Sequence, residues 1–277
     1  MGEMIGKQSV KFAEAPYIFE GASVVGPKEG EGPLGKLFDV IEQDPMLGSK
    51  SWEEAESLLQ KETVQKLLLK SGLKKEDIRY IFAGDLLGQL IATTFGIMDY
   101  EIPFMGLYGA CSTMGEGLSL AAMMVAAGYG ENVIAMASSH FGSAERQFRF
   151  PLEYGNQRPF SATWTVTGCG AAIVTKRKGF AKITGVTTGK IIDYGVKDAQ
   201  NMGACMAPAA ADVIYNHLND FGTTPDDYDK IITGDLGYVG QAILIDLLKR
   251  KGIDISKVHM DCGIEMFDKE NQDTHSG

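Results

Sequence analysis

The stretch DIRYIFAGDL, residues 77–86, returns 150 positions later as DYDKIITGDL, residues 227–236. In both copies an apolar run of strand length ends in Gly-Asp-Leu, and a glycine stands five residues ahead of the copy, at Gly72 and at Gly222. Each copy also follows a segment with helical periodicity, residues 52–70 and 207–221. A repeat whose flanks also match indicates duplication of one α/β unit, and both repeated strands are expected to be central in packed sheets.

Segments of helix and strand length alternate along the first copy and beyond it. Helical periodicity covers residues 52–70, 88–98 and 113–127, and apolar runs of strand length cover residues 78–83, 102–108, 132–138 and 164–175. The last of these runs contains Gly168-Cys169-Gly170, which is expected to break the strand. This alternation predicts the α/β class, with buried and largely parallel strands.

The duplication divides the chain into a first half, residues 1–178, and a second half, residues 179–277. After its copy of the repeat, the second half continues through a helix at 241–251 and a short strand near Val258, and then reads DKENQDTHSG. It contains no counterpart of helix 113–127 or of the strands that follow that helix. We therefore expect the second half to be incomplete, either naturally abbreviated or truncated at the C-terminus.

Composition excludes several classes of function. The chain has 277 residues, 44% of them hydrophobic, and a net charge of −10, which would repel a nucleic acid backbone. Its four cysteines lack paired metal-ligand spacing, so we expect thiols in a reducing compartment and no metal site. The glycine-rich stretch 26–35 lacks the Lys-Ser/Thr of a P-loop, so we expect no nucleotide and assign no cofactor.

Hydrophobic segments are short. The first ten residues, MGEMIGKQSV, contain no apolar region of a signal peptide. The longest apolar stretch, around residues 118–127, is far shorter than the roughly 18 residues that suggest a membrane span. We therefore expect a soluble chain that is not secreted and has no transmembrane segment, although it could still dock on a membrane complex.

The sharpest local feature is Gly109-Ala110-Cys111-Ser112-Thr113, between a predicted strand and a predicted helix. A cysteine at such a turn lies where unpaired helix N–H groups and the helix dipole favour the thiolate, which is the nucleophilic form. Thr113 and Glu116 also have the spacing of a capping box. The alternative is that Cys111 is a small buried core residue, since cysteine is among the most buried residue types.

Several motifs resemble known families. The Cys111 turn with its glycine-rich helix, the strand containing Gly168-Cys169-Gly170, and the duplication together resemble the thiolase superfamily, which includes the ketoacyl synthases. Longer motifs closely resemble the stage V sporulation protein AD family of endospore-forming bacteria, and the resemblance spans essentially the whole chain. These motifs are GPKEGEGPLG (26–35), AGDLLGQ (83–89), SSHFGSAERQFRFPLEYGNQRP (138–159), MAPAAAD (206–212), TPDDYDKIITGDLGYVG (224–240) and HMDCG (259–263).

The resemblance implies a five-layered αβαβα fold and a role in sporulation. It implies a protein that binds dipicolinic acid (pyridine-2,6-dicarboxylic acid), as the acid or its calcium salt, and supports its transport into the developing spore and its release at germination. The partners implied are the other subunits of a spore membrane channel complex and a second copy in a homodimer, with a location in the cytoplasm or peripheral on the inner spore membrane. Family members continue beyond the point where this chain stops, in agreement with the gap in the second half.

The resemblance also bears on catalysis. Condensing enzymes of the superfamily acylate a cysteine, and Cys111 matches that nucleophile position. Where ketoacyl synthases of the type III class carry a histidine after the repeated strand, this chain has Asp235, whose carboxylate cannot donate a hydrogen bond to an oxyanion. His259 and His275 match no catalytic motif. We expect a non-catalytic binder; the alternatives are an acyltransferase or condensing enzyme using Cys111, and a structural adaptor whose pocket is vestigial.

A dianionic planar ligand is best met by guanidinium groups, which bind carboxylates in a bidentate fork. Arg146, Arg149 and Arg158 supply three of them beside aromatic residues, and His140 is expected near the same rim. The alternative is an ion-pair network of these arginines with Glu145 and Glu153. The expected ligand-binding set is Cys111, His140, Arg146, Arg149 and Asp235.

Overall fold

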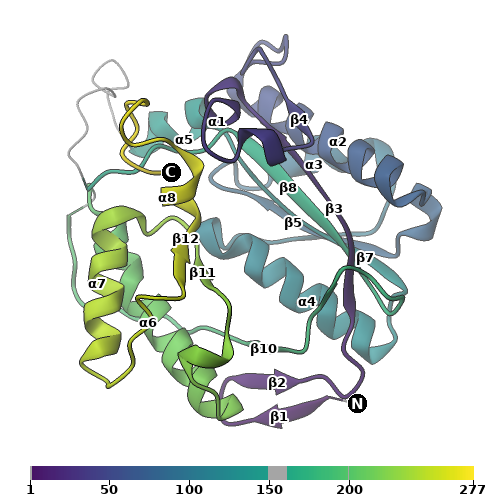
Figure 1. Ribbon diagram of the computed structural model, residues 1–277. Helices are drawn as coiled ribbons and strands as arrows, with labels where there is room; N and C mark the ends of the chain where they lie inside the picture. The colour runs from purple at the N-terminus through teal and green to yellow at the C-terminus, as the bar shows by residue number, and fades with distance from the viewer. Residues whose placement is uncertain (1, 149–160, 199) are drawn as a thin grey trace. The chain divides into compact units, whose positions relative to one another are not determined.

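The computed structural model describes residues 2–148, 161–198 and 200–277 (Figure 1). The chain forms two compact units. Unit 1 comprises the described residues of Phe12–Leu152 and Thr165–Thr184, together with Gly2, and unit 2 comprises those of Glu3–Lys11, Glu153–Trp164 and Gly185–Gly277. Three of the five expected ligand-binding residues fall in the described part of unit 1, and Asp235 falls in unit 2. The division into halves 1–178 and 179–277 stays a prediction.

Unit 1 is built on a seven-stranded sheet with the order β4-β3-β8-β7-β5-β6 and with β9 pairing to β3. Strand β5 runs parallel to β6 and β7, and β3 runs parallel to β4, but β8 runs antiparallel to both of its neighbours, β3 and β7. The strands are β3 (Tyr17–Val25), β4 (Val40–Ile41), β5 (Tyr80–Asp85), β6 (Phe104–Gly106), β7 (Asn132–Ser139), β8 (Gly168–Thr175) and β9 (Ala181–Lys182).

Two sequence expectations about this sheet are wrong. The sheet is mixed rather than largely parallel, because β8 returns between β3 and β7 in the opposite direction. Periodicity reports how deeply a strand is buried and carries no information on its direction. Strand β8 also begins at Gly168 instead of being broken there, and its glycines lie in continuous pairing with β3 and β7.

Helices cover both faces of this sheet. Helix α2 (Trp52–Ser71) packs against β3 and β8 on one face, with α3 (Ile91–Ile97) along it, and α4 (Thr113–Ala127) packs against β7 and β5 on the other (Figure 1). Helix α2 begins where the Ser51 side chain accepts a hydrogen bond from Glu54 N at 3.2 Å, and it ends at Gly72, whose φ of 68° is left-handed. Two shorter helices, α1 (Pro27–Gly30) and α5 (Phe141–Phe148), also belong to unit 1.

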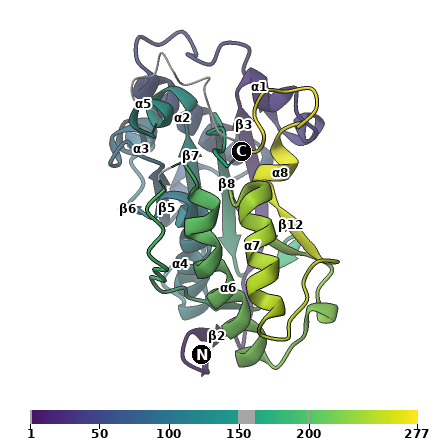
Figure 2. The same ribbon diagram turned by 90° about the vertical axis from the view of Figure 1, so that its left-hand side faces the viewer.

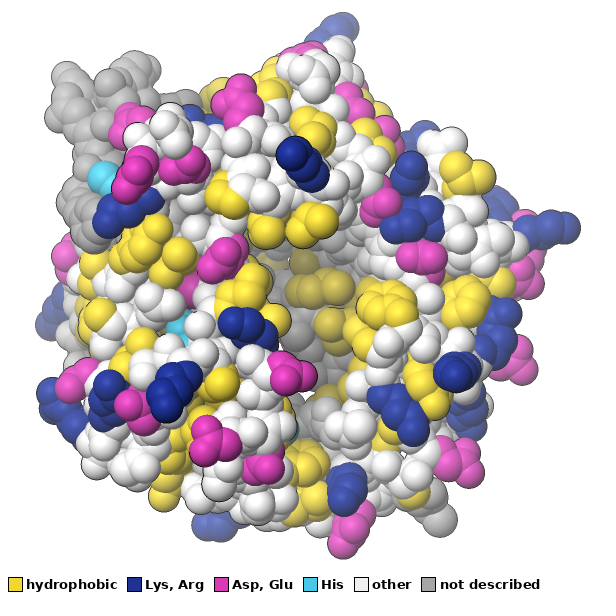
Figure 3. Space-filling model, viewed as in Figure 1, with side chains coloured by type: hydrophobic (Ala, Val, Ile, Leu, Met, Phe, Trp, Pro, Cys, Tyr) yellow, Lys and Arg dark blue, Asp and Glu magenta, His cyan; other side chains and the backbone are white. Residues whose placement is uncertain are grey.

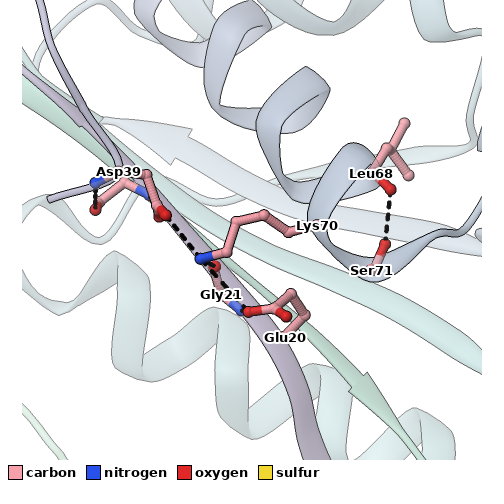
Figure 4. Close-up of polar contacts among 7 residues, drawn as sticks. Glu20, Gly21, Asp39, Leu68, Lys70 and Ser71 are labelled. Atoms are coloured by element: carbon pink, nitrogen blue, oxygen red, sulfur yellow. Dashed lines mark hydrogen bonds and ion pairs between the residues drawn. The ribbon is translucent and has the colours of Figure 1, made fainter.

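An ion cluster at the end of α2 fixes this helix to the sheet (Figure 4). Lys70 Nζ donates to Gly21 O at 2.6 Å and pairs with Asp39 at 2.8 Å and with Glu20 at 3.5 Å. Partial burial acts to lower the pKa of Lys70, but the two carboxylates outweigh this effect and raise that pKa above its ordinary value. The last turn of α2 is therefore held on β3 by charge as well as by apolar packing.

Helix α4 together with the 3₁₀ turn before it, Ala110–Ala127, is the one helical stretch of the described residues that is long and apolar enough to cross a membrane. Length and composition alone are weak evidence for a span, because core helices of soluble proteins pass the same test. Here Ala121, Ala122 and Val125 are fully buried, and the helix packs on β7 and β5. These contacts identify α4 as a helix that covers the sheet.

Unit 2 contains two small sheets and two long helices. Strands β1 (Glu3–Ile5), β2 (Ser9–Lys11) and β10 (Gly185–Thr187) form an antiparallel sheet, and β11 (Ile231–Thr233) and β12 (His259–Asp261) form a parallel pair. Helices α6 (Met202–Phe221) and α7 (Gly237–Lys249) pack side by side, and the short α8 (Cys262–Met266) follows β12 (Figure 2). The buried core of unit 2 consists of Ala207, Ala211, Leu236, Leu244, Leu248 and Ile255.

The repeat read from the sequence recurs in the order of elements. Helix α2 leads through a short 3₁₀ turn into β5 and α3, and α6 leads through a similar turn into β11 and α7. The turns match in detail, since Asp77 accepts a hydrogen bond from Lys74 N, and Asp227 accepts one from Thr224 N, each at 2.8 Å. The sheets differ, because β5 has neighbours on both sides whereas β11 pairs, among the described residues, with β12 alone. The expectation that both strands are central is therefore wrong for β11.

Candidate functional site

Cys111 lies on a tight turn that joins β6 to α4 in unit 1. Pairing of β6 with β5 extends to Leu107, whose N–H donates to Ala83 O at 2.8 Å. The chain then enters a 3₁₀ turn, Ala110–Ser112, and α4 begins at Thr113. Ala110 has a φ of 47°, in the left-handed region that costs a residue with a Cβ about 1 kcal/mol or more. The turn thus holds Cys111 next to the N-terminus of a 15-residue helix, as predicted.

Two glycines make this turn possible. A Cβ on Gly84 of β5 would collide with the carbonyl oxygen of Leu107. A Cβ on Gly109 would lie only 2.7 Å from the Glu116 carboxylate and from Ser112 Oγ, which donates to Gly109 O at 2.8 Å. Close approach of the Leu107 backbone therefore requires Gly84, whereas a side chain at Gly109 would have to displace the side chains of Glu116 and Ser112.

The predicted capping box at this turn does not form. The N-cap position is Ser112, and no side chain caps the helix there. Because the 3₁₀ turn starts the helical path earlier, Thr113 occupies the first helical position, and its side chain is 98% buried. Its Oγ1 has no hydrogen-bond partner among the described residues. Cys111 itself is exposed, which contradicts the alternative that it is a buried core residue.

His140 lies at the junction of β7 and α5, and Arg146 lies in the last turn of α5. His140 is 3% exposed; its Nδ1 accepts from Gly142 N at 3.0 Å, which leaves the proton on Nε2 to donate to Pro45 O at 2.8 Å. Burial lowers the pKa of His140, with smaller opposing effects from the bond to Pro45 and the charge of Glu53. This side chain is a neutral imidazole bonded to the backbone through both ring nitrogens.

Arg146 projects from α5 toward α2. Its guanidinium pairs with the Glu53 carboxylate and lies 5.4 Å from the centre of the Trp52 ring, and its side chain is 52% exposed. The same ring fills the space beside Gly142, where a Cβ would collide with the indole. An ion pair was the alternative to ligand binding for Arg146. The structure contains such a pair, and the partner is the Glu53 carboxylate on α2. Arg149, Arg158 and Glu153 lie outside the described residues.

Cys111 and His140 share one edge of the sheet in unit 1. Each follows a strand, β6 or β7, that runs parallel to β5 and pairs with it. The carboxyl edge of parallel strands is the usual location of binding sites in α/β sheets. Cys111 and His140 therefore lie at the edge of the sheet where such a site is expected.

Asp235 lies in unit 2, in the loop between β11 and α7, with a φ of 61°. Its charge acts on the thiol of Cys262 at the start of α8. Burial raises the pKa of the Cys262 thiol, and the negative charges of Asp235, Asp261 and Glu265 raise it further. This thiol is therefore held in its protonated form, which is a poor nucleophile.

The centre of the same loop cluster is Asp261, which the sequence did not single out. Its carboxylate is 1% exposed and accepts four hydrogen bonds, from Thr233 Oγ1 at 2.8 Å, Leu236 N and Gly237 N at 3.1 Å and Ile264 N at 3.3 Å. It thereby joins the end of β11, the start of α7 and the start of α8. The motif HMDCG carries the only signal for it, an aspartate that ends a short strand.

His259 is tied to this carboxylate through a hydroxyl. Thr233 Oγ1 gives its proton to Asp261, so it accepts from His259 Nε2 at 2.9 Å, and Gln241 Nε2 donates to His259 Nδ1 at 3.1 Å. Burial lowers the pKa of His259, and the charge of Asp261 offsets part of that effect. His259 is thus a neutral imidazole whose hydrogen bonds connect β12 with β11 and α7.

Charged side chains and cysteines show no further cluster in the described part of the chain. On the face drawn in Figure 3, Lys and Arg side chains are interspersed with Asp and Glu and do not gather by sign. Among the residues described, no group of three or more His, Cys, Asp or Glu side chains could hold a metal ion. None of the four cysteines, all of which lie in the described part, forms a disulfide.

Comparison with solved structures shows the fold. The protein is similar to 3-oxoacyl-[acyl-carrier-protein] synthase III from Aquifex aeolicus, with a TM-score of 0.57 and 14% sequence identity, over 91% of this chain and 85% of that one. It is also similar to a tetronic acid condensing enzyme, with a TM-score of 0.56, 14% identity and the same coverage. The fold is therefore the thiolase-like α/β fold of the condensing enzymes, as the sequence predicted.

Comparison of sequences shows the family. The profile of the family described as stage V sporulation protein AD matches residues 6–277. The stage V sporulation protein AD of Bacillus subtilis (strain 168) is 42% identical over 270 residues, which cover 98% of this chain and 80% of that protein. This protein therefore belongs to the stage V sporulation protein AD family, whose members are sporulation proteins built on the thiolase-like fold.

Proposed function

We propose that this protein binds dipicolinate and supports its transport into the developing spore and its release at germination, without catalysing a reaction. The proposal rests on the family resemblance, which implies this ligand, and on one structural observation. Arg146 presents a half-exposed guanidinium from the last turn of α5, beside the ring of Trp52 at the start of α2. In this role the protein is the ligand-binding partner of membrane channel subunits, located in the cytoplasm or peripherally on the inner spore membrane.

The chemistry around Arg146 suits a planar dianion. A guanidinium can bind a carboxylate through two parallel N–H donors, and an adjacent indole offers a flat apolar face. The present partner of Arg146 is Glu53, whose side chain is 28% exposed. A ligand carboxylate can therefore compete with Glu53 for the guanidinium at an open surface, where neither carboxylate must be fully desolvated.

A fluorescence experiment tests the proposed site. The chain contains two tryptophans, Trp52 and Trp164. A ligand held by Arg146 lies beside the Trp52 indole, so we expect dipicolinate to change the tryptophan emission saturably. Isophthalate, which keeps both carboxylates, should act similarly, and picolinate, which has one, should act only at higher concentration.

The control for this experiment is Trp52→Phe, which leaves Trp164 as the single reporter. We expect the ligand-induced change in emission to disappear in this variant. A full signal in Trp52→Phe, or unchanged emission in the parent protein at concentrations where binding is otherwise detected, would place the ligand elsewhere.

A second candidate function is acyl transfer through Cys111. The observation that favours it is the exposed thiol on a strained turn at the N-terminus of α4, within the fold of the condensing enzymes. Against it stands Asp235, the residue at the position where the resemblance implies a histidine. A carboxylate there cannot donate a hydrogen bond to a developing oxyanion.

We expect no turnover of acetyl and malonyl thioesters and no stable acyl adduct on Cys111. The measurement is intact-protein mass spectrometry after incubation with the thioesters, with Cys111→Ala as the matched control. A condensation activity that the parent shows and Cys111→Ala loses would replace the binding proposal by the enzyme.

We also propose that the protein is a homodimer that pairs through β6. This strand is the edge of the unit 1 sheet, so its outer N–H and C=O groups are available to a second strand. Large apolar side chains stand exposed on and beside it, on α3 and on the turn that leads to Cys111. They are Ile91, Phe95, Met98, Met105 and Tyr108, from 38% to 62% exposed.

A charge placed on this surface is expected to separate the dimer. Phe95→Glu should convert a particle of about twice the chain mass of 29.9 kDa into a monomer, measured by light scattering after gel filtration. Leu69→Glu is the matched control, because Leu69 is 76% exposed on α2 and should tolerate the charge. A parent protein that is already monomeric would contradict the proposed pairing.

A further inference from the structure

A buried chain of polar side chains runs between α2 and the carboxyl ends of β5 and β7. Gln60 stands in its middle, and its Nε2 donates to Ser138 Oγ at 2.7 Å and to Thr93 Oγ1 at 3.0 Å. Ser138 donates onward to Glu56 Oε1 at 2.7 Å, and Thr93 donates onward to Asp85 Oδ2 at 2.7 Å. Every member is at least nine-tenths buried, so two carboxyl groups sit in the interior of unit 1.

The hydroxyl of Ser143 decides which form of Glu56 fits this site. Ser143 Oγ lies 3.2 Å from Glu56 Oε2 and 3.0 Å from His140 O, and it has a single proton for these two acceptors. If Glu56 is ionised, Ser143 can donate to only one of these two oxygens. If Glu56 carries a proton on Oε2, it donates to Ser143 and Ser143 donates to His140 O, so that both contacts are hydrogen bonds.

His140 O is also the first backbone acceptor of helix α5. Ala144 N donates to it at 3.1 Å, which closes the first turn of this helix. The bond from Ser143 thus joins the Glu56 carboxyl to the start of α5. Within the described residues Glu56 has no ion pair, so no fixed cation holds its charge in the interior.

We propose that Glu56 is a buried proton-binding site that controls the order of α5. With the proton bound, the hydrogen bonds run from Glu56 through Ser143 to His140 O and hold the first turn of the helix. When the proton is lost, the Ser143 hydroxyl donates to the Glu56 carboxylate instead, and His140 O accepts a hydrogen bond from Ala144 N only. The helix that carries Arg146 is then less firmly anchored.

The groups around Glu56 favour the protonated form. Burial is the largest effect, and the charges of Asp85 on β5 and Glu53 on α2 add to it, so that the pKa of Glu56 is raised to about 7 despite the opposing bonds from Ser138 and Ser143. Helix α3 and strand β7 carry no titratable side chain, and β8 contributes Cys169, whose pKa burial raises to about 12.

The remaining elements packed on α2 bring charges that are engaged elsewhere. Helix α5 carries Glu145, whose Oε1 accepts from Thr165 N at 3.3 Å, and Arg146, which pairs with Glu53. Strand β3 carries Tyr17, over which Lys182 lies, and Glu20, which pairs with Lys70 at the far end of α2. Tyr80 stands at the start of β5, stacked with Arg79, while Asp85 ends that strand.

The sign of the pH dependence follows from these effects. An unfolded glutamic acid loses its proton around its ordinary pKa of 4.5, whereas the folded protein keeps the proton up to about pH 7. The contribution of Glu56 to stability is therefore complete below about pH 4.5 and is lost progressively as the pH rises toward 7. Above that pH the loss is constant.

Infrared difference spectroscopy of the whole protein tests the proton directly. We expect the stretching band of a buried protonated carboxyl group at about pH 6, where solvated carboxyl groups are ionised, and its disappearance by about pH 8. The band should be missing in Glu56→Gln and present in Glu131→Gln, which removes an exposed glutamate of unit 1. A parent protein without this band at about pH 6 would overturn the proposal.

Hydrogen exchange of the 141–148 segment tests the coupling. In the parent, exchange corrected for the intrinsic rate should be about two- to tenfold faster above pH 7 than at pH 6, the factor for losing one hydrogen bond of typical net strength. Glu56→Gln should stay protected at both pH values, because its amide can donate to Ser143 as the protonated acid does. If Glu56→Gln is poorly folded, the parent's infrared band and exchange profile still decide, and equal protection of the parent at both pH values would refute the coupling.

Discussion

Replacing Asp261 with Ala is expected to destabilise unit 2 by at least about 3 kcal/mol. The carboxylate is buried and accepts four hydrogen bonds from β11, α7 and α8, and each buried donor left without a partner costs about 1–3 kcal/mol. Thermal unfolding followed by circular dichroism should show a lower melting temperature. For a chain of this size the shift corresponds to roughly 6–12 °C.

Asp229→Ala is the matched control, because Asp229 is exposed in the same unit and its loss removes the same charge. We expect that variant to melt within about 1 °C of the parent, as surface substitutions usually do. Asp261→Asn should also be destabilised. Each carboxylate oxygen of Asp261 accepts from two donors, and the NH₂ group of an asparagine in place of one oxygen would face two donors instead of accepting from them. Equal melting of Asp261→Ala and Asp229→Ala would show that these four bonds do not hold the loops together.

Replacing Arg146 with Ala is expected to weaken dipicolinate binding by about 1.5–3 kcal/mol, roughly 10- to 150-fold, with little change in fold. This is the range for a hydrogen bond to a charged group. Arg146→Lys should restore only part of the affinity, because an ammonium group keeps the charge and loses the fork. Calorimetric titration of each variant gives the affinity, and thermal melting gives the fold.

The matched control for this prediction is Arg79→Ala. Arg79 also lies over an aromatic ring, Tyr80, at 5.2 Å, but it stands at the opposite end of β5 from Asp85. We expect unchanged affinity in Arg79→Ala. If Arg146 serves only its ion pair with Glu53, any loss of binding will instead follow a loss of thermal stability, and Arg146 leaves the proposed site. Arg149→Ala provides an independent comparison.

The elements nearest the repeat could be predicted because local signals agreed there. Helix α4 spans residues 113–127 as expected. Its apolar residues indicate the helix, and Gly128, whose φ is 82°, ends it. Helix α2 ends at Gly72 for the same reason. The strands of the first 41 residues, which pair with distant partners such as β8 and β10, gave no comparable signal. Pairing over such sequence distances leaves little trace in local periodicity.

The polar interior of unit 1 could not be predicted from the sequence. Glu56 and Gln60 lie on α2 among charged residues, and their types are those of a solvated helix face. Their buried polar groups find partners on other elements: Gln60 donates to Ser138 and Thr93, and Glu56 accepts from Ser138. The same holds for Asp261, whose partners lie up to 28 residues away. Burial of a polar side chain is decided by partners that sequence spacing does not reveal.

The site residues were predicted unevenly. The sequence placed Cys111 at a helix N-terminus because the strand, turn and helix are contiguous in the chain. His140 was predicted to bind a ligand, but both of its ring nitrogens form hydrogen bonds with the backbone groups of Pro45 and Gly142. Nothing in the local sequence identifies Pro45, 95 residues earlier, as the partner of that imidazole.

Calorimetric titration of the whole protein with dipicolinate tests the central claim most directly. We predict saturable binding of one ligand per chain, weakened in Arg146→Ala and unaffected in Arg79→Ala, with no covalent adduct on Cys111. A cooperatively folded parent protein that releases no binding heat with dipicolinate, at any temperature across the stable range, would contradict the account.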